Sequence, residues 1–291
     1  MKKKAIINSF FSVFIVLTAY ILCRIIKQSP SLPKVTEVLS SAVTIFSSSG
    51  LYINALYTAK IVFIGVLVSL ILGFIIAVAC SMNDVANAMI MPIINCTKNI
   101  PSITLFPLFI VLMGIGDLPR ISIIIWNSIY PIISSTMLGL NSVEREIEEA
   151  GWNCGATKFQ MYFYIKIPLA LLDVLNGLKI SLSNGFIAIV VAEMLGATKG
   201  LGYMVLWSAN AFQYPDMYVY ILVIALIGFS INVVIEKLIK KVERKVYYEN
   251  RKVGFFQNCI NFAHRNPVCV GCHRIILSIG MLGKRGSDRR A

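Results

Sequence analysis

The residues most capable of chemistry lie near the end of the chain. Cys269, Cys272 and His273 form a C-x-x-C-H string, the spacing at which c-type haem is attached. With Cys259 and His264 nearby, the same residues offer a set of zinc ligands. One hypothesis is therefore a redox or metal-binding membrane protein that uses this tail. Haem of this type is attached on the outer side of the membrane, whereas the tail is predicted to lie inside, so we expect an unligated tail, no cofactor and no metal.

Polar and ionisable side chains inside apolar stretches are the next candidates for functional residues. Asp173, Lys179 and Glu193 fall within such stretches, where ionisable groups are costly and are by default candidates for function. Glu193 lies near the outer end of its stretch, so two interpretations stay open: it lines a translocation path, or it caps the neighbouring loop. Asn184 is a further polar candidate for the path.

The sequence contains no recognisable catalytic motif. The phosphate-binding string G-x-x-x-x-G-K-[ST] is absent, as are G-x-S-x-G, H-E-x-x-H and a paired-carboxylate arrangement. We therefore predict that the chain is not an enzyme. Any hydrolysis of ATP that it uses would belong to another subunit.

The elements that must position these residues are membrane-spanning helices. The chain is 57% hydrophobic and only 14% charged, whereas about a quarter of the residues in soluble domains are charged. Apolar stretches of about 20 residues, the length that crosses a bilayer, recur along it. They predict an all-α polytopic membrane protein with about six transmembrane helices, near residues 5–26, 61–80, 89–113, 121–140, 169–195 and 218–239.

Charge sets the expected orientation. Three lysines open the chain, and residues 236–291 carry 13 basic against 4 acidic residues, which is most of the net charge of +13. Basic residues beside apolar helices mark the cytoplasmic side. With six spans, we predict a protein of the cell membrane with both termini in the cytoplasm. A membrane-anchored basic tail requires no nucleic-acid partner, and we predict none.

The third predicted span is interrupted by prolines. Pro101 and Pro107 lie within it, so it should bend or break. Irregular backbone at membrane depth survives where protein or a water-filled cavity covers it. The segment is therefore either a lining of the translocation path or a packing kink. A carrier driven by an ion gradient would show breaks at matching positions in two half-repeats, and no counterpart is evident.

The charged stretch between the fourth and fifth spans, residues 141–167, predicts two short helices on the cytoplasmic side. Asn141 and Glu144 have the spacing of a capping box for the first helix, and Thr157 and Gln160 have it for the second. Gly155 is placed as a left-handed stop between them. Aromatic residues spaced by three and four then give the second helix an apolar face.

This stretch resembles the cytoplasmic "EAA" loop of binding-protein-dependent ABC transporter permeases. That pattern has E-A-A, three residues, G, nine residues and I-x-L-P, and the chain has Glu149-Ala150-Gly151, then Gly155, then Ile165-x-Ile167-Pro168. Gly151 replaces the second alanine and Ile167 the leucine. The strings "MPIINCTKNIPSITLFPLFIVLMGIG" and "AEMLGATKGLGYMV" extend the likeness to permeases of the nitrate, sulfonate and taurine type.

The resemblance implies the ABC importer type I permease fold and a division of the chain. Residues 1–53 would be an N-terminal anchor helix and extracytoplasmic segment. Residues 54–248 would be the transmembrane domain with the coupling loop 141–167, and residues 249–291 a basic cytoplasmic tail. In such permeases the loop inserts into a groove on the ATPase. The residues expected to couple to it are Glu149, Ala150, Gly151, Gly155, Thr157, Lys158, Phe159 and Tyr162.

By the same resemblance, the chain would be the permease subunit of an ATP-driven importer that works by alternating access. Its partners would be cytoplasmic ABC ATPase subunits, an extracytoplasmic solute-binding protein and a second copy of the chain. The solute would be a nitrate-, sulfonate- or taurine-like anion or a pyrimidine vitamin precursor. The residues expected to line the path are Pro101, Pro107, Asn184 and Glu193.

Overall fold

The computed structural model describes residues 32–252, with side chains to residue 243. This part of the chain contains helices and no strand, so the all-α prediction is confirmed there. In chain order the helices are α2 (Val35–Ser47), α3 (Ser49–Met82), α4 (Asp84–Thr97), α5 (Ser102–Met113), α6 (Asp117–Asn141), α7 (Arg145–Asn153), α8 (Lys158–Gln160), η1 (Met161–Lys166), α9 (Ile167–Gly196), α10 (Leu201–Asn210) and α11 (Tyr214–Lys252).

The long apolar helices account for the predicted spans within the described residues. Four of these helical stretches are long and apolar enough to cross a membrane, namely α3, α6, α8 to α9 taken together, and α11. The pair α4 and α5 passes the same test together. The described part of the chain therefore supports four or five spans. The first predicted span, near residues 5–26, lies outside the described residues.

The third predicted span is broken, as its prolines indicate. Helices α4 and α5 meet at an angle of 101° across a break of four residues. Pro101 stands at the start of α5, as its N-cap, whereas Pro107 lies inside α5. Proline lacks an amide hydrogen and crowds the preceding turn, so a helix interrupted at Pro101 is the expected outcome.

A row of small residues lets α3 and α6 approach closely. Gly65, Ser69, Gly73 and Ala77 recur at every fourth position and are all buried. A Cβ added at Gly65 would meet Ile124 at 2.6 Å, and one added at Gly73 would meet Ile132 at 2.9 Å. Membrane helices associate by close packing of such faces, so this row fixes how α3 lies against α6.

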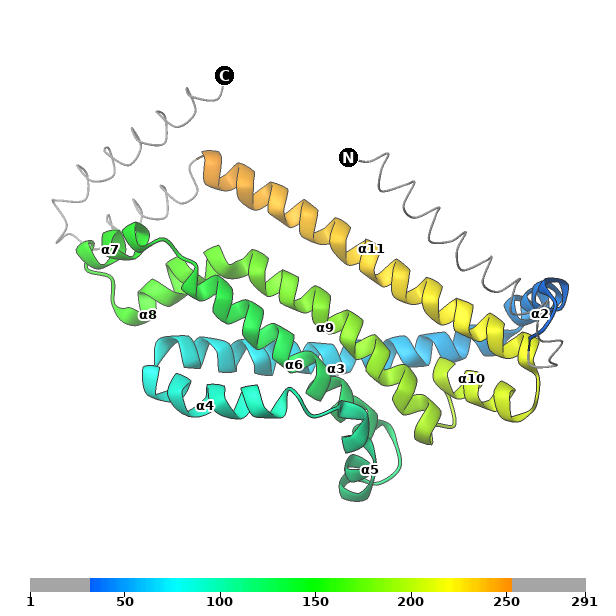
Figure 1. Ribbon diagram of the computed structural model, residues 1–291. Helices are drawn as coiled ribbons and strands as arrows, with labels where there is room; N and C mark the ends of the chain where they lie inside the picture. The colour runs from blue at the N-terminus through cyan, green and yellow to red at the C-terminus, as the bar shows by residue number, and fades with distance from the viewer. Residues whose placement is uncertain (1–31, 253–291) are drawn as a thin grey trace.

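Helix α9 also packs closely on α6 through small residues, and it contacts α3 as well. The hydroxyl of Ser128 donates to the carbonyl of Ser181 at 3.0 Å, and the hydroxyl of Ser181 donates to the carbonyl of Ser128 at 2.6 Å. Gly177 faces Ser135 of α6. Helix α6 thus lies at the centre of the bundle, with α3 and α9 against it (Figure 1).

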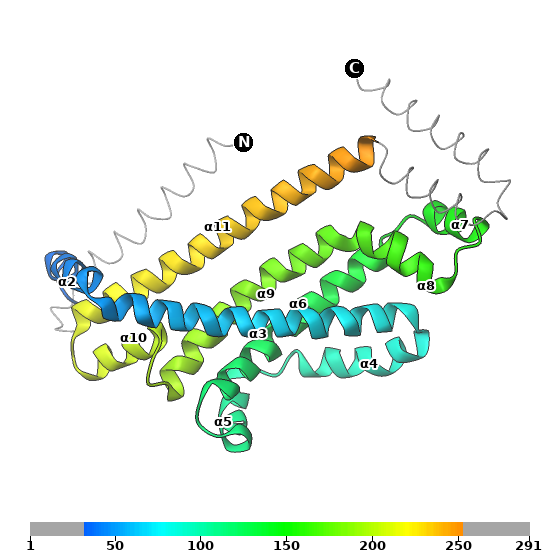
Figure 2. The same cartoon turned by 180° about the vertical axis from the view of Figure 1, so that it is seen from behind.

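The two ends of the bundle differ. Helices α7, α8 and η1 lie at one end, which we call the hairpin end, and α2 and α10 lie at the other, which we call the far end; both views agree (Figures 1 and 2). Helix α2 is seen nearly end-on in both views, so it runs across the direction of the long helices. It packs on the start of α11, where Ser41 hydrogen-bonds Asp216.

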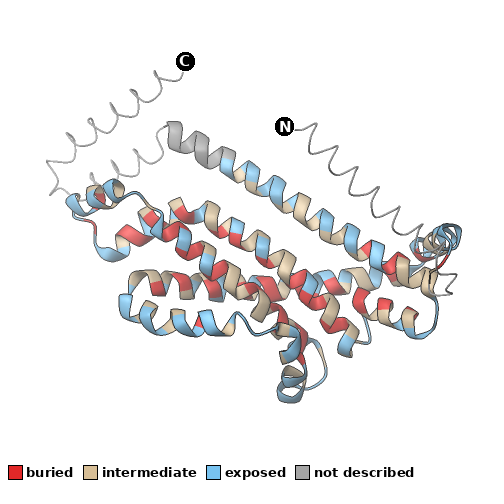
Figure 3. Ribbon diagram, viewed as in Figure 1, coloured by how far each residue is buried: buried red, intermediate tan, exposed pale blue. Residues whose placement is uncertain are grey.

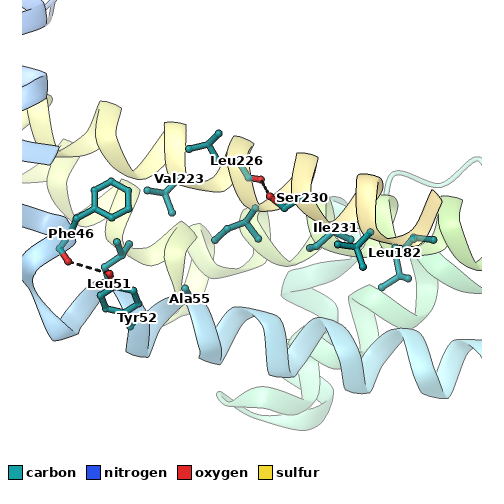
Figure 4. Close-up of a pocket in the computed structure, with 12 residues that line it drawn as sticks. Phe46, Leu51, Tyr52, Ala55, Leu182, Val223, Leu226, Ser230 and Ile231 are labelled. Carbon is teal, nitrogen blue, oxygen red and sulfur yellow. Dashed lines mark hydrogen bonds between the residues drawn. The ribbon is translucent and has the colours of Figure 1, made fainter. Parts of the chain in front are cut away.

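Helix α11 packs on α2 and α10 near the far end, and its middle contacts α9, where Lys179 lies 3.8 Å from Glu236. The space between α11, α3 and α9 is a groove of about 590 Å³. Its lining is apolar except for the hydroxyls of Tyr52 and Ser230, which donate to the carbonyls of Phe46 at 3.3 Å and of Leu226 at 2.7 Å (Figure 4). Many residues on the outer surface of the bundle are exposed (pale blue in Figure 3), and a large share of them are bulky and apolar, as expected for helices that face lipid.

Candidate functional site

The segment between α6 and α9 folds as a helical hairpin, residues 142–166, at one end of the bundle (Figure 1). Its first helix does not begin as predicted. Helix α6 continues through Asn141, and α7 begins at Arg145 with Glu144 as its N-cap and no side-chain cap. Because Asn141 already has helical backbone as the last residue of α6, it cannot cap α7. The capping box predicted for Asn141 and Glu144 is therefore wrong.

The turn between the two helices follows the prediction. Gly155 has φ +77°, in the left-handed region, and a Cβ added there would have open space around it. Thr157 is the N-cap of α8, and its hydroxyl accepts from the amide of Gln160 at 3.4 Å. The side chain of Gln160 accepts in return from the amide of Thr157 at 2.9 Å. The second capping box is confirmed, and it fixes the direction in which α8 leaves the turn.

Gly151 is where α7 packs on η1. It is buried, and a Cβ built on it would meet the terminal methyl of Met161 at 2.5 Å and Ile165 at 3.1 Å. Met161 is itself fully buried. The glycine that departs from the E-A-A pattern therefore faces a flexible methionine end, which can shift to admit one methyl group.

An ion pair that the sequence did not predict closes the hairpin. The Lys166 ammonium lies 2.6 Å from a carboxylate oxygen of Glu148, and their side chains are 11% and 29% exposed. Lys166 also lies over the ring of Tyr162, 4.9 Å from its centroid. The two partners are far apart in sequence and on different helices, so no helical spacing rule could have identified them.

Tyr162 attaches the hairpin to the bundle. Its ring is buried with Leu140 and Ala170, and its hydroxyl donates to the carbonyl of Ser81 at the end of α3. We expected Tyr162 to contribute to surface contact, and the structure differs, because the side chain packs on its own protein. The aromatic spacing that suggested one exposed face does not reveal which ring turns inward.

Two other aromatic residues of the hairpin remain on the surface. The rings of Phe159 and Phe163 are stacked, with centroids 4.2 Å apart, and the residues are 60% and 45% exposed. Thr157 and Lys158 are exposed beside them. The hairpin therefore presents a stacked aromatic pair and a lysine on a tightly packed base.

The acidic part of the hairpin is on the solvent side of α7. Glu149 is exposed and pairs with Arg145 one turn earlier at 3.2 Å. Ala150 is half-buried beside Gly151. The structure thus brings the predicted coupling residues into one compact unit, with Tyr162 and Gly151 inside it and the others at its surface.

A second group of polar residues meets at the far end, and we call it the far-end cluster; Thr58, Arg120 and Glu193 are buried in it. It consists of Asn54, Tyr57, Thr58, Asp117, Arg120 and Glu193, from α3, α6 and α9. Glu193 is fully buried: one carboxyl oxygen accepts from the Thr58 hydroxyl at 2.7 Å, and the other accepts from the amide of Gly202 at 2.9 Å. Of the two interpretations of Glu193, capping of the neighbouring segment describes this geometry.

Arg120 ties the cluster to α6 and was missed from the sequence, where it falls between the third and fourth predicted spans. Helix α6 begins at Asp117, and Arg120 is buried in its first turn. Its guanidinium donates to the Tyr57 hydroxyl at 2.5 Å, to Asp117 at 3.1 Å and to the carbonyl of Gly196 at 2.9 Å. An arginine at the edge of an apolar stretch was the available signal.

The residues predicted to line the path are not brought together. Pro101 and Pro107 are exposed on α5, and Asn184 is half-buried on α9. Glu193 belongs to the far-end cluster. A polar link between α5 and α6 does exist, because the side-chain amide of Asn127 donates to the hydroxyl of Ser102 at 2.8 Å.

Within residues 32–252, no group of three or more His, Cys, Asp or Glu side chains is placed to hold a metal ion. The C-x-x-C-H string at Cys269, Cys272 and His273 lies outside the described residues. The redox or metal-binding hypothesis therefore gains no support from this part of the chain.

Comparison with known proteins places the chain in a family. A family model described as "binding-protein-dependent transport system inner membrane component" matches residues 65–248, which include the whole hairpin. The formylaminopyrimidine transport permease ThiX of Halalkalibacterium halodurans is 27% identical over 235 residues, covering 81% of this chain and 94% of that protein. The taurine transport permease TauC of Escherichia coli is 28% identical over 207 residues, covering 69% and 75%.

A solved structure shows the same fold. The inward-facing MetNI methionine ABC transporter contains a chain with a TM-score of 0.57 and 20% identity, covering 64% of this chain and 92% of that one. The fold agrees with the resemblance that the hairpin sequence suggested. This multi-pass membrane protein therefore belongs to the family of binding-protein-dependent transport system inner membrane components, the permease subunits of ABC importers.

Proposed function

We propose that this chain moves a small solute across the cell membrane by alternating access, driven by ATP that a separate subunit hydrolyses. The observation that carries the proposal is the hairpin between α6 and α9, a compact helical unit with an exposed stacked aromatic pair. A unit that transmits force must be rigid, because a floppy connector would absorb displacement in its own conformational freedom.

The hairpin is proposed to be the contact with the ATPase. Glu149, Ala150, Gly151 and Gly155 would shape it, since they form α7 and the turn that follows. The exposed residues Thr157, Lys158 and Phe159 would contact the ATPase.

Tyr162 has a different part in this proposal. It would pass movement on to the bundle, because its ring is buried at the base and its hydroxyl is bonded to the end of α3. Lys166 would keep α7 aligned with that base through Glu148.

The translocation path is proposed to run along the open sides of α5 and α9, closed by a second copy of the chain. Asn176, Ile180, Asn184 and Ile187 recur at spacings of three and four, so they share one face of α9, and this face is exposed or half-buried in the isolated chain. Pro101 and Pro107 would keep α5 short and tilted beside the path. We therefore propose a homodimer whose halves meet over this face.

The remaining partner is a solute-binding protein on the outer side of the membrane. The family description names this dependence. The far end of the bundle would receive it, and the hairpin end and both termini would face the cytoplasm, in line with the lysine-rich start and basic end of the chain.

The solute class is proposed from the relatives. ThiX is named for formylaminopyrimidine and TauC for taurine, so a small sulfonate-like anion or a pyrimidine vitamin precursor is proposed here. Uptake of both probes by proteoliposomes containing the complete transporter would distinguish them.

The proposal is tested by co-purification with the ATPase subunit. We expect a stable complex that Phe159→Asp disrupts, because a charge would replace the exposed ring in the proposed contact. Phe212→Asp is the matched control, since Phe212 is also an exposed phenylalanine, 76% against 60% for Phe159, and lies at the far end; it should leave the complex intact. Equal retention of the ATPase by both variants would contradict this function for the hairpin.

A further inference from the structure

The far-end cluster holds a feature that the proposed ATPase contact does not use: it joins α10 to two spanning helices. Helix α10 does not cross the membrane but packs at the far end beside α9 and α11 (Figure 1). The first amides of a helix have no partner within it. In α10 the amide of Gly202 donates to Glu193 of α9 at 2.9 Å, and the amide of Leu201 donates to the Thr58 hydroxyl of α3 at 3.0 Å.

Thr58 connects these contacts into one chain of hydrogen bonds. Its hydroxyl accepts from Leu201 and donates to Glu193 at 2.7 Å, and both Thr58 and Glu193 are fully buried. One turn earlier on α3, Asn54 accepts from the amide of Gly200 at 2.7 Å. The start of α10 is thus held by three side chains from two different spans, of which Thr58 and Glu193 are fully buried and Asn54 is half-buried.

The backbone at the start of α10 is packed tightly against α9. Gly200 has φ +117°, and a Cβ there would collide with the Glu193 carboxyl group. A Cβ on Gly202 would collide with the carbonyl of Val190. Only residues without a side chain allow α10 to approach α9 this closely.

The free-energy cost of burying the Glu193 side chain indicates that this arrangement has a functional role. An ionisable side chain fully buried at the end of a membrane helix is expensive, and a nonpolar residue would fill the same volume without needing partners. Arg120, which donates to the carbonyl of Gly196 at the end of α9, extends the same network to α6. The network therefore reaches from α10 to all three helices of the central bundle.

We propose that Glu193 and Thr58 are positioning residues that make α10 part of one rigid unit with α3 and α9, so that the transport cycle moves α10 together with these spans. The inference rests on the proposed alternating access and deepens it by naming the far-end element that moves. Without this link, α10 would be held only by its packing, and motion of the spans would no longer be passed to it.

The direct test is a distance measurement between α10 and α3. Spin labels at Asn210 and Lys60, both exposed, would be introduced into the full-length permease in lipid nanodiscs, alone and in complex with the ATPase. We expect a narrow distance distribution that is the same in nucleotide-free and nucleotide-trapped complexes. Thr58→Val should broaden this distribution. Thr58→Ser keeps the hydroxyl and should leave the distribution as narrow as in the wild type.

Ser69→Ala is the matched control. Ser69 is also a fully buried hydroxyl on α3, but it bonds the carbonyl of Gly65 in its own helix. Its loss should leave the distribution narrow. If Thr58→Val behaves like Ser69→Ala, or if the wild-type distance changes when nucleotide is trapped, the inference is wrong.

A second readout separates positioning from simple instability. In proteoliposomes with ATPase and binding protein, using taurine and formylaminopyrimidine as probes, Thr58→Val should lower the ratio of uptake to ATP hydrolysis by about tenfold. Its basal hydrolysis should stay within about twofold of wild type. An equal fall in both activities would mean that Thr58 only supports folding.

The experiments also distinguish a failure of the proposed function from a failure of this inference. If the wild-type chain neither binds the ATPase nor transports solute, the proposed function fails. The label distances in the permease alone would still decide whether Thr58 fixes α10.

Discussion

Gly155 is the residue on which the geometry of the hairpin turn most directly depends. Its φ of +77° is costly for residues with a Cβ, although no neighbour would touch the added atom. The loss of stability on substitution therefore comes from backbone conformation alone. It should depend on how well each residue type tolerates the left-handed region, and not on the size of its side chain.

We predict that Gly155→Ala lowers the free energy of unfolding by about 1 kcal/mol, and Gly155→Asn by less, because asparagine tolerates this conformation. Thermal unfolding of the purified variants would measure the difference, and ATPase co-purification should weaken in the same order. Equal stability of the alanine and asparagine variants would show that the turn does not hold this conformation.

Phe212, between α10 and α11, is the one described residue other than glycine with positive φ, at 56°. Its side chain is 76% exposed and meets Tyr214 edge-on, with ring centroids 6.3 Å apart. We predict that Phe212→Asn is more stable than Phe212→Ala by about 1 kcal/mol, since both lose the ring and only asparagine suits the backbone. The two melting curves, recorded in the same detergent, would decide this.

At the scale of the elements, the hairpin is held together by a partly buried ion pair. Lys166 and Glu148 are mostly shielded from solvent, whereas Arg145 and Glu149 are 90% and 63% exposed. Attraction between charges is screened less where water is excluded. The two pairs lie in the same hairpin, so they form a matched comparison.

A double-mutant cycle with Lys166→Met and Glu148→Gln should give a coupling energy of about 1–3 kcal/mol. The cycle for the exposed pair, with Arg145→Met and Glu149→Gln, should give less than about 1 kcal/mol. Unfolding free energies of the four variants in each cycle would supply both values. A larger coupling in the exposed pair would contradict the observed packing.

The close packing of α3 on α6 leads to a prediction about the stability of variants in α3. Gly65→Ala should destabilise the protein by about 1–3 kcal/mol, because the new methyl group would lie 2.7 Å from the Cβ of Ile124, which cannot move without its backbone. Gly50→Ala on the same helix is the control: its Cβ would find only Ser48 at 3.9 Å. That substitution should be neutral or stabilising by about 0.5–1 kcal/mol.

At the scale of the whole molecule, the proposed orientation places the hairpin inside the cell and the far end outside. Lys158 of the hairpin and Lys199 before α10 are both exposed. We predict that Lys199→Cys reacts with an impermeant thiol reagent in intact cells, and that Lys158→Cys reacts only after permeabilisation. The parent chain provides the background, since Cys96 is exposed. The reverse pattern would overturn the orientation and the proposed ATPase contact together.

The sequence alone determined the features that depend on residues close together in the chain. Apolar stretches long enough for a bilayer predicted the spans, prolines predicted the break before α5, and Gly155 with Thr157 and Gln160 predicted the turn of the hairpin. Each of these is decided within about one helical turn or by the length of one helix. The capping box at Asn141 failed because the length of α6 is set by its packing.

Only the tertiary structure decided which polar groups meet. Thr58 and Glu193 are separated by 135 positions, Tyr162 and Ser81 by 81, and Arg120 and Gly196 by 76. No local pattern links such partners, because they are brought together by the close approach of α3, α6 and α9 along faces of small residues. The physical reason is that a buried polar group must find its partner wherever helix packing places one.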